Sequence, residues 1–179
     1  LEVELVPRSG RHTILFGRIE QVERKFDKLL RFYRNGENLG PGHNWNRGVE
    51  LARGVWTTFL HDDDLLRPDA LRSIAGIISR HAHLEKPLIH ARRIEFSDDF
   101  DARLAERHDR PFDQELTRTG ALIRGWSQTA VPSCGTTILK KAYVEAGGVD
   151  YAFGGTADAV LGYRIMKRYT VLLSGRTLG

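Results

Sequence analysis

A short apolar run that ends in three consecutive aspartates constrains this chain more than any other feature. Residues 55–60 read Val-Trp-Thr-Thr-Phe-Leu, which is rich in β-branched and aromatic side chains and short, as is typical of a buried strand. Asp62, Asp63 and Asp64 follow after His61. In open α/β sheets, ligands bind where strands end at the carboxyl edge. The run therefore predicts a buried strand with a ligand site at its end.

The acidic cluster has two interpretations. Adjacent carboxylates repel one another, and a divalent cation relieves that repulsion. Hard oxygen ligands suit Mg²⁺ or Mn²⁺, and Mg²⁺ takes one or two carboxylates together with substrate phosphates. Alternatively, the acids are solvated in a loop and favour the N-terminus of the next helix. The cluster by itself supports both interpretations equally.

Strand-like and helix-like segments alternate along the chain. Strands are predicted over residues 1–6, 30–33, 55–60, 88–94 and 170–174, and helices over 19–29, 45–52, 68–78, 140–146 and 158–169. Residues 35–42 form a loop, and residues 97–129 are expected to be irregular. This alternation predicts an α/β fold with a largely parallel sheet.

Composition narrows the class of protein. A chain of 179 residues predicts a single domain over residues 1–179. No run is apolar enough for a membrane span, and no leader suggests export, so we expect a cytoplasmic protein, with a peripheral place at the inner membrane face as the alternative. The net charge is +4, but the arginines are interleaved with acids, which favours a mixed surface over a nucleic-acid face. The single Cys134 excludes an internal disulfide.

Two blocks of motifs occur in the order and spacing of a known family. The first comprises Asn38-Leu39-Gly40, Asn46-Arg47-Gly48, Ala52-Arg53-Gly54 and the run Phe-Leu-His-Asp-Asp-Asp-Leu-Leu-Arg-Pro-Asp-Ala-Leu over residues 59–71. It resembles the central block of family 2 glycosyltransferases of the GT-A type. The second comprises Ile138-Leu139-Lys140-Lys141, Gly147-Gly148-Val149-Asp150 and Asp158-x-x-Leu161-x-x-Arg164, and it is similar to the family's stretch that ends in Glu-Asp-x-x-Leu-x-x-Arg.

The resemblance implies a fold and an activity. The fold is a GT-A-like, Rossmann-related α/β domain whose mostly parallel sheet is flanked by helices. The activity is the inverting transfer of a sugar from a nucleotide-diphosphate sugar to a saccharide or other hydroxyl acceptor, with Mn²⁺ or Mg²⁺ as cofactor.

The resemblance also implies roles for single residues. Asp62 and Asp64 would hold the metal, Asp62 and Asp63 would face the sugar nucleotide, and Asp158 would be the general base. His61 stands where many relatives carry the first acid, and we interpret it as a strand-end residue. The remaining expected contacts with donor or acceptor come from Asn38, Gly40, Asn46, Gly135 and Thr136. For Asn46, a structural role in the helix is equally supported.

Three departures from the family pattern affect this interpretation. Nothing here corresponds to the Pro-x-Tyr-Asn loop of relatives, residues 5–10 lack the acids of Asp-Asp-Gly-Ser, and Ala157 replaces the Glu of Glu-Asp. The chain is therefore expected to be shortened at both ends, either as a fragment of a longer enzyme or as an inactive descendant. A non-catalytic binding module is the second hypothesis. A nucleic-acid binder is the third, although no aromatic-basic motif supports it.

Overall fold

The computed structural model describes residues 2–5, 12–16, 30–33, 35–61, 64–82, 88–92, 113–116, 119–120, 136–169 and 171–178. Its strands are β1 (Glu2–Leu5), β2 (His12–Phe16), β3 (Leu30–Tyr33), β4 (Trp56–Leu60), β5 (Leu88–Arg92), β6 (Asp113–Leu116), β7 (Thr136–Leu139) and β8 (Val171–Thr177). Its helices are α1 (Pro41–Leu51), α2 (Ala70–Arg80), α5 (Lys140–Glu145) and α6 (Ala157–Arg168), and a 3₁₀ segment, η2 (Tyr151–Thr156), precedes α6.

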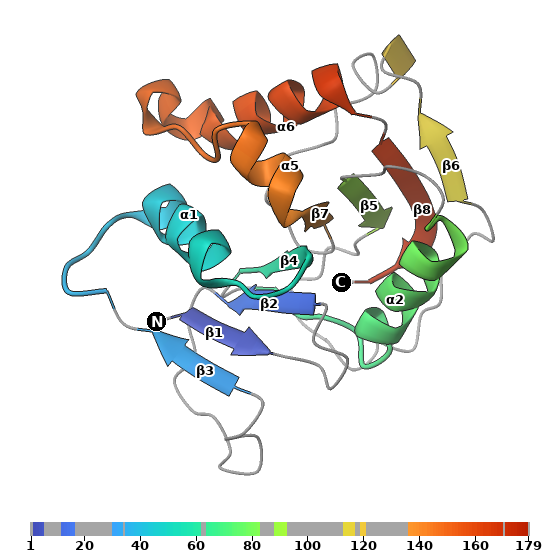
Figure 1. Ribbon diagram of the computed structural model, residues 1–179, viewed down its shortest axis with the longest axis horizontal. Helices are drawn as coiled ribbons and strands as arrows, with labels where there is room; N and C mark the ends of the chain where they lie inside the picture. Colours follow the sequence, from blue (N-terminus) through green and yellow to red (C-terminus); the bar gives the residue numbers. More distant parts are fainter. Residues whose placement is uncertain are drawn as a thin grey trace, which may run out of the picture.

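The strands form one eight-stranded sheet in the order β3-β1-β2-β4-β7-β5-β8-β6 (Figure 1). Only the pairs β2–β4 and β5–β8 are parallel, and the other five pairs are antiparallel. The prediction of a mostly parallel sheet is therefore wrong. Only residues 6–11 separate β1 from β2, which is too short for the crossover that a parallel pair needs. β7 and β6 also run against their neighbours, so β1, β6 and β7 oppose the direction of the other five strands.

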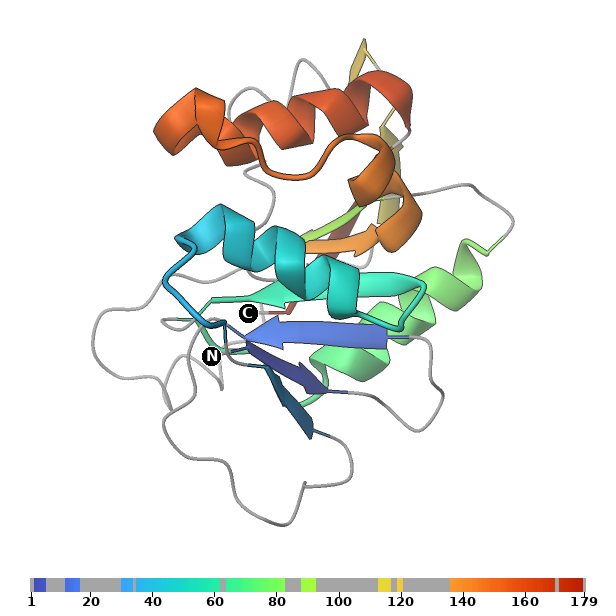
Figure 2. The ribbon, with the colours of Figure 1, turned by 60° about the vertical axis from the view of Figure 1, so that its left-hand side comes forward.

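Helices cover both faces of the sheet. Figure 2 shows α1, α5 and α6 on one face and α2 on the other. Neighbouring residues of β5 and β8 serve these two faces: Leu88 and Val171 join the core beneath α5 and α6, whereas Ile89 and Leu172 pack with Ile77 of α2. This alternation follows from the two-residue period of a strand. The α/β class and the flanking helices are thus confirmed.

β4 is a buried strand in the middle of the sheet, as its composition predicts. Residues 57–60 are each at most 7% exposed. Two buried hydroxyls in this interior, those of Thr58 and of Thr137 on β7, form a hydrogen bond with each other at 2.7 Å. The pairing register sets these two threonines opposite each other. The bond compensates for the burial of both hydroxyls.

Most predicted elements are present within a few residues of their expected bounds. The helix expected over residues 19–29 lies outside the described residues. Three strands were not predicted, namely β2, β6 and β7, and β6 lies inside the segment that was expected to be irregular. Among the residues that the structure describes, no helix is long and apolar enough to cross a bilayer.

Hydrogen bonds to the carboxylate of Asp113 connect the end of α2 to the edge strand β6. The carboxylate of Asp113 on β6 accepts hydrogen bonds from Arg80 at the end of α2 and from Ser174 of β8, both at 2.7 Å. His81 lies 3.3 Å from the same carboxylate. Burial alone would raise the pKa of Asp113, but the bonds from Arg80, Ser174 and His81 outweigh it and hold the pKa below its ordinary value of 3.8.

We expect Asp113→Asn to lower the free energy of unfolding at neutral pH by about 1–3 kcal/mol, because charged hydrogen bonds are lost. A carboxyl with a lowered pKa stabilises the fold above its unfolded pKa and loses that contribution as pH falls through its folded value. The stability of the parent protein should therefore drop below about pH 4, and the Asn variant should show a smaller drop. Urea unfolding from pH 7 to pH 2.5 measures both, with Glu37→Gln, an exposed carboxylate, as the control. Parallel pH profiles for the parent and Asp113→Asn would contradict the assignment.

Candidate active site

The predicted acidic cluster follows β4 at an edge of the sheet where several strands end. Asp64 is described, whereas Asp62 and Asp63 lie outside the described residues. β2 is parallel to β4, and β5 runs in the same direction because both are antiparallel to β7. The carboxyl ends of these strands therefore share one edge, which is where open α/β sheets bind ligands.

His61 lies beside Asp64. Its Nδ1 is 3.5 Å from Oδ2 of Asp64. The imidazole ring stacks on Trp45 of α1, with 5.4 Å between ring centroids and 15° between the planes. Its Nε2 is buried and has no hydrogen-bond partner among the described residues. The stacking holds the ring next to the carboxylate, and the sequence pattern could not show this contact because Trp45 is distant along the chain.

The described residues at this edge offer one carboxylate and one imidazole to a cation. Within these ranges, no group of three or more His, Cys, Asp or Glu side chains could hold a metal ion. The donor chemistry of Asp64 nevertheless fits, because Mg²⁺ takes as few as one carboxylate when substrate phosphates supply other ligands. The metal site with Asp62 and Asp64 stays a prediction.

Asn38 and Gly40 form the turn that begins α1. The side-chain oxygen of Asn38 accepts a hydrogen bond from the backbone N–H of Gly40 at 2.9 Å. Gly40 has a φ of 72°, in the left-handed region that favours glycine, and Pro41 takes the first helical position. Both residues therefore have a local structural role, and their contact with the nucleotide stays a prediction.

Asn46 joins α1 to the segment that follows α5. Its amide nitrogen donates to the carbonyl of Val149 at 2.8 Å, and its oxygen accepts from the N–H of Val149 at 2.9 Å and from the hydroxyl of Tyr143 at 2.7 Å. Tyr143 is buried, and burial raises the pKa of its hydroxyl above the ordinary value, so the group stays a donor even in alkaline solution. These contacts give Asn46 a structural role, and its predicted contact with the nucleotide stays a prediction.

Two glycines allow this close approach. Gly147 and Gly148 end α5 with φ values of 87° and 64°. A Cβ on Gly148 would lie 2.5 Å from the side-chain oxygen of Asn46, closer than atoms can approach without a shift. The left-handed backbone favours glycine at both positions, and the packing of Asn46 adds a second reason at Gly148.

The Asp158-x-x-Leu161-x-x-Arg164 motif lies on α6, and its three residues have different surroundings. Asp158 lies in the first turn of α6, where a carboxylate is favoured by the helix dipole, and it accepts a bond from the N–H of Ala159 at 2.7 Å. Leu161 is fully buried in the core. Arg164 reaches back to Asp150 at 3.4 Å, and its guanidinium lies 5.5 Å from the centre of the Phe153 ring.

Thr136 and Gly135 were predicted to approach the donor sugar or the acceptor. Thr136 is the first residue of β7, it is fully buried, and its hydroxyl lies 3.3 Å from Nδ1 of His90 on β5. Its predicted contact with substrate stays a prediction. Gly135 lies outside the described residues.

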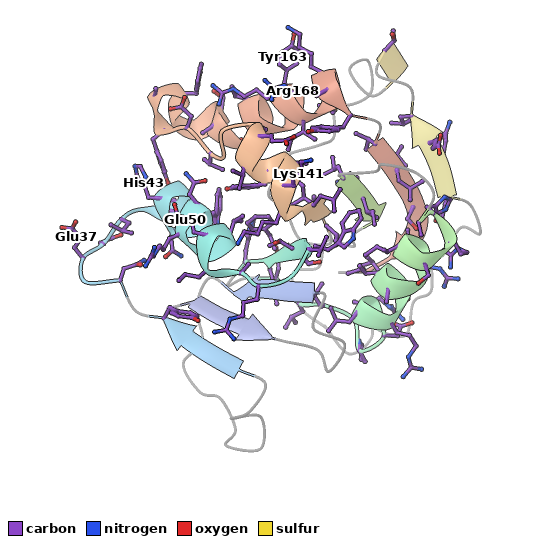
Figure 3. The ribbon with its side chains drawn as sticks, viewed as in Figure 1. Glu37, His43, Glu50, Lys141, Tyr163 and Arg168 are labelled. Atoms are coloured by element: carbon purple, nitrogen blue, oxygen red, sulfur yellow. The ribbon has the colours of Figure 1, made fainter. Side chains whose placement is uncertain are left out.

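Tyr151 forms a contact with α1 that the sequence analysis missed. Its hydroxyl accepts a hydrogen bond from the backbone N–H of Gly42, one of the amides that a helix start leaves without a partner. His43, labelled in Figure 3 at the first turn of α1, stacks on the Tyr151 ring with 5.2 Å between centroids. A Cβ on Gly42 would lie 2.6 Å from Val149 and 2.7 Å from Tyr151. α1 thus contacts both the end of β4, through Trp45, and the segment before α6.

The profile of "Glycosyl transferase family 2" matches residues 18–148 of the chain, which include the whole first block of motifs. The chain belongs to glycosyltransferase family 2. This match ends at residue 148, within the second block, so Asp158 lies beyond it. The family assignment that the motifs predicted is confirmed.

Known proteins similar to this family 2 chain are longer than it. The succinoglycan biosynthesis protein ExoO of Rhizobium meliloti (strain 1021) is 44% identical over 46 residues, which are 26% of this chain and 13% of ExoO. The structure of S. aureus TarS 1–349 superimposes with a TM-score of 0.64 at 13% identity, over 96% of this chain and 51% of that one. TarS 1–349 in complex with UDP-GlcNAc gives a TM-score of 0.51 at 16% identity, over 78% of this chain and 38% of that one. The likeness to TarS shows a shared fold, and the chain spans about half of TarS 1–349 or less.

We expect Gly148→Ala to destabilise the family 2 chain by about 2 kcal/mol or more, because it combines a left-handed φ with a clash against Asn46. Gly155→Ala is the matched control, since a Cβ there meets nothing within 4 Å and its φ is not left-handed. The control should change stability by less than about 1 kcal/mol. Chemical unfolding of the two variants measures the difference, and equal stabilities would contradict the proposed packing.

Proposed function

We propose that the chain carries the catalytic site of an inverting glycosyltransferase. Its donor is a nucleotide-diphosphate sugar and its acceptor is the hydroxyl of a saccharide. The observation that carries the proposal is the Asp64 carboxylate directly after the buried β4, inside the region that matches family 2. TarS, which shares the fold, has a structure in complex with UDP-GlcNAc, and ExoO takes its name from succinoglycan biosynthesis, which supports this donor and acceptor class.

The proposed reaction assigns the proton transfer to Asp158. The acceptor O–H loses its proton to the Asp158 carboxylate as the oxygen attacks the anomeric carbon. The bond from that carbon to the diphosphate oxygen breaks, and the electron pair leaves with the diphosphate. A carboxylate is a competent base for this step when it reaches the hydroxyl within hydrogen-bond distance. The half-buried position of Asp158 at the start of α6 supports the role, because the side chain stays accessible.

Asp64 and Asp62 are proposed to hold the cation on the diphosphate, with Asp63 facing the sugar nucleotide. When bound, Mn²⁺ or Mg²⁺ would offset the negative charge that develops on the departing diphosphate. The His61 ring supports this role, because it stacks on Trp45 and its Nδ1 lies close to the Asp64 carboxylate. Further proposed contacts to donor or acceptor come from Asn38, Gly40, Asn46, Gly135 and Thr136.

A family 2 module that binds a donor without turnover is the second candidate. Ala157 supports it, since this residue is buried in α6 where relatives carry the Glu of Glu-Asp and so supplies no carboxylate. Under this alternative, calorimetry detects binding of UDP-GlcNAc with Mn²⁺, while no product forms with any acceptor. Formation of product that requires Asp158 would contradict it.

We expect Asp158→Asn to lower kcat by about 10²–10⁴-fold, because the amide cannot take the proton. The affinity for UDP-GlcNAc should change little, since Asp158 acts on the acceptor. Release of UDP in the presence of Mn²⁺ and acceptor measures kcat, and calorimetry measures affinity. Asp69→Asn, an acid on the loop before α2, is the control and should retain the activity of the parent. Unchanged kcat in Asp158→Asn would refute the role of general base.

We expect Asp64→Asn to weaken Mn²⁺ binding in the presence of UDP by at least about tenfold, because a charged ligand is replaced by a neutral one. The electron paramagnetic resonance signal of free Mn²⁺ gives this affinity without depending on turnover. Asp69→Asn should bind Mn²⁺ like the parent. Equal affinities in Asp64→Asn and the parent would show that Asp64 is not a ligand.

A further inference from the structure

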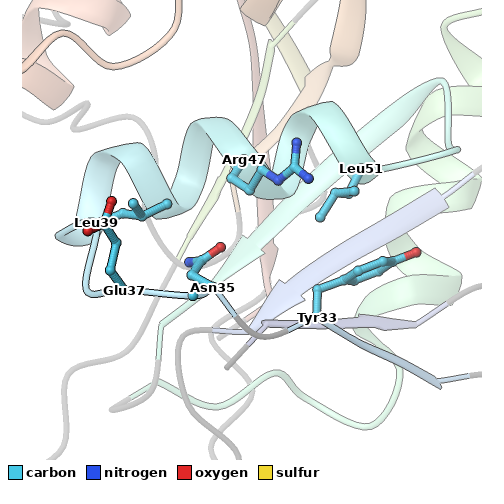
Figure 4. A pocket seen from close by; sticks show the side chains of 7 residues that line it. Tyr33, Asn35, Glu37, Leu39, Arg47 and Leu51 are labelled. Atoms are coloured by element: carbon cyan, nitrogen blue, oxygen red, sulfur yellow. The ribbon is translucent and has the colours of Figure 1, made fainter.

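A hollow lies along the flank of α1 that carries Arg47 and Leu51, beside the loop that holds Asn38 and Gly40. It has a volume of about 610 Å³ and lies between α1 and the segment that follows β3 (Figure 4). This volume falls within the range of about 300–1,000 Å³ that is typical of small-molecule sites. Arg47 and Leu51 contribute from α1, and Tyr33 contributes from the end of β3.

The hollow and the contacts of Asn46 lie on opposite sides of α1. Arg47 and Leu51 are four residues apart and therefore share one side of the helix. Gly42, Asn46 and Val49 also recur at spacings of three and four, and they lie on the opposite side, toward the segment after α5. The hollow is thus separated by the body of the helix from the contacts around Asn46.

Hydrogen bonds within the chain hold the walls of the hollow in place. The amide nitrogen of Asn35 donates to the side-chain oxygen of Asn44 on α1 at 2.7 Å. The turn between Asn38 and Gly40 fixes the end of the same loop. On α1, Arg47 pairs with Glu50 at 3.0 Å. A site whose walls are already held loses less conformational entropy on binding.

The lining suits a neutral ligand with hydroxyl groups. Glu37 and Arg47 give it one negative and one positive charge, and Arg47 is already paired with Glu50. A phosphate or nucleotide would prefer a group of cations or a helix N-terminus. The Tyr33 ring and the side chains of Leu39 and Leu51 add apolar surface.

From this juxtaposition of an aromatic ring, aliphatic walls and polar groups, we propose that the hollow binds a neutral oligosaccharide. The C–H face of a pyranose packs on the Tyr33 ring and on Leu51, while its hydroxyls bond to Asn35, Glu37 and Arg47. Aromatic rings with a polar end suit this kind of two-sided contact. The site is independent of Asp64 and Asp158.

Gly36 makes the proposal testable without removing a contact. It lines the hollow, a Cβ there would meet nothing within 4 Å, and its φ is not left-handed. Gly36→Phe should therefore fill the hollow and leave the fold intact. Gly76→Leu is the matched control on α2, where a Cβ would meet only the flexible end of Arg80 at 3.4 Å.

The probes are three tetrasaccharides of glucose, with β-1,4, α-1,4 and β-1,3 linkages, measured by saturation-transfer NMR and calorimetry. We expect at least one to bind the parent protein, Gly76→Leu, Asp64→Asn and Asp158→Asn alike. Gly36→Phe should abolish that binding, and Tyr33→Ala should weaken it roughly tenfold through loss of the aromatic contact. Circular dichroism and thermal unfolding confirm that each variant is folded.

Three results would overturn the proposal: no tetrasaccharide binds the parent protein, Gly36→Phe binds as well as the parent, or uridine binds in the hollow and displaces the tetrasaccharide. Loss of binding in Asp64→Asn or Asp158→Asn would also overturn it, since the ligand would then occupy the catalytic site. Because these two variants separate the sites, failure of the oligosaccharide site and failure of the proposed catalysis are distinguishable.

Discussion

The side-chain amide of Asn46 is the contact on which the arrangement of this domain depends. It connects α1, which follows the edge strand β3, to the segment between α5 and α6, and it does so with three hydrogen bonds. Because α1 also carries Trp45 against His61 and Gly42 against Tyr151, fixing this helix places the end of β4 and the start of η2 relative to one another. The candidate catalytic residues Asp64 and Asp158 follow these two points along the chain. One half-buried amide therefore orders parts of the site that are far apart in sequence.

Much of this fold could be predicted from local patterns. Residues 55–60 specify a buried strand by composition alone, and the Asn-x-Gly and Gly-Gly motifs mark the start of α1 and the end of α5, where left-handed backbone is observed. The direction of the strands could not be predicted, because a strand has the same alternation whichever way it runs. β7 is short and is followed at once by α5, so its four residues gave no separate signal. β6 contains the polar run Asp-Gln-Glu, and it joins the sheet through β8 and the bonds of Asp113.

The candidate site was predictable in its residue types and not in its contacts. Motif spacing led to Asp64 and Asp158, and the family match covers the first of these positions but not the second. The neighbours that hold the site were missed, because Trp45, His43 and Tyr151 act through ring contacts between elements that are distant in the chain. The contacts of Asn46 were likewise not visible in the sequence pattern. The resemblance assigns this motif residue to substrate, and only the three-dimensional arrangement could show that its side chain also bonds to Val149 and Tyr143.

The protonation of Tyr143 has a chemical consequence for the lifetime of the molecule. At neutral pH this hydroxyl is protonated and donates to the oxygen of Asn46, so the amide nitrogen faces the carbonyl of Val149. Deamidation of Asn46 would put a second oxygen against that carbonyl, with no proton between them at neutral pH. The hydrogen bond to the carbonyl of Val149 would be replaced by repulsion between two oxygen atoms. Slow hydrolysis of this one side-chain amide would therefore weaken the connection between α1 and the segment after α5.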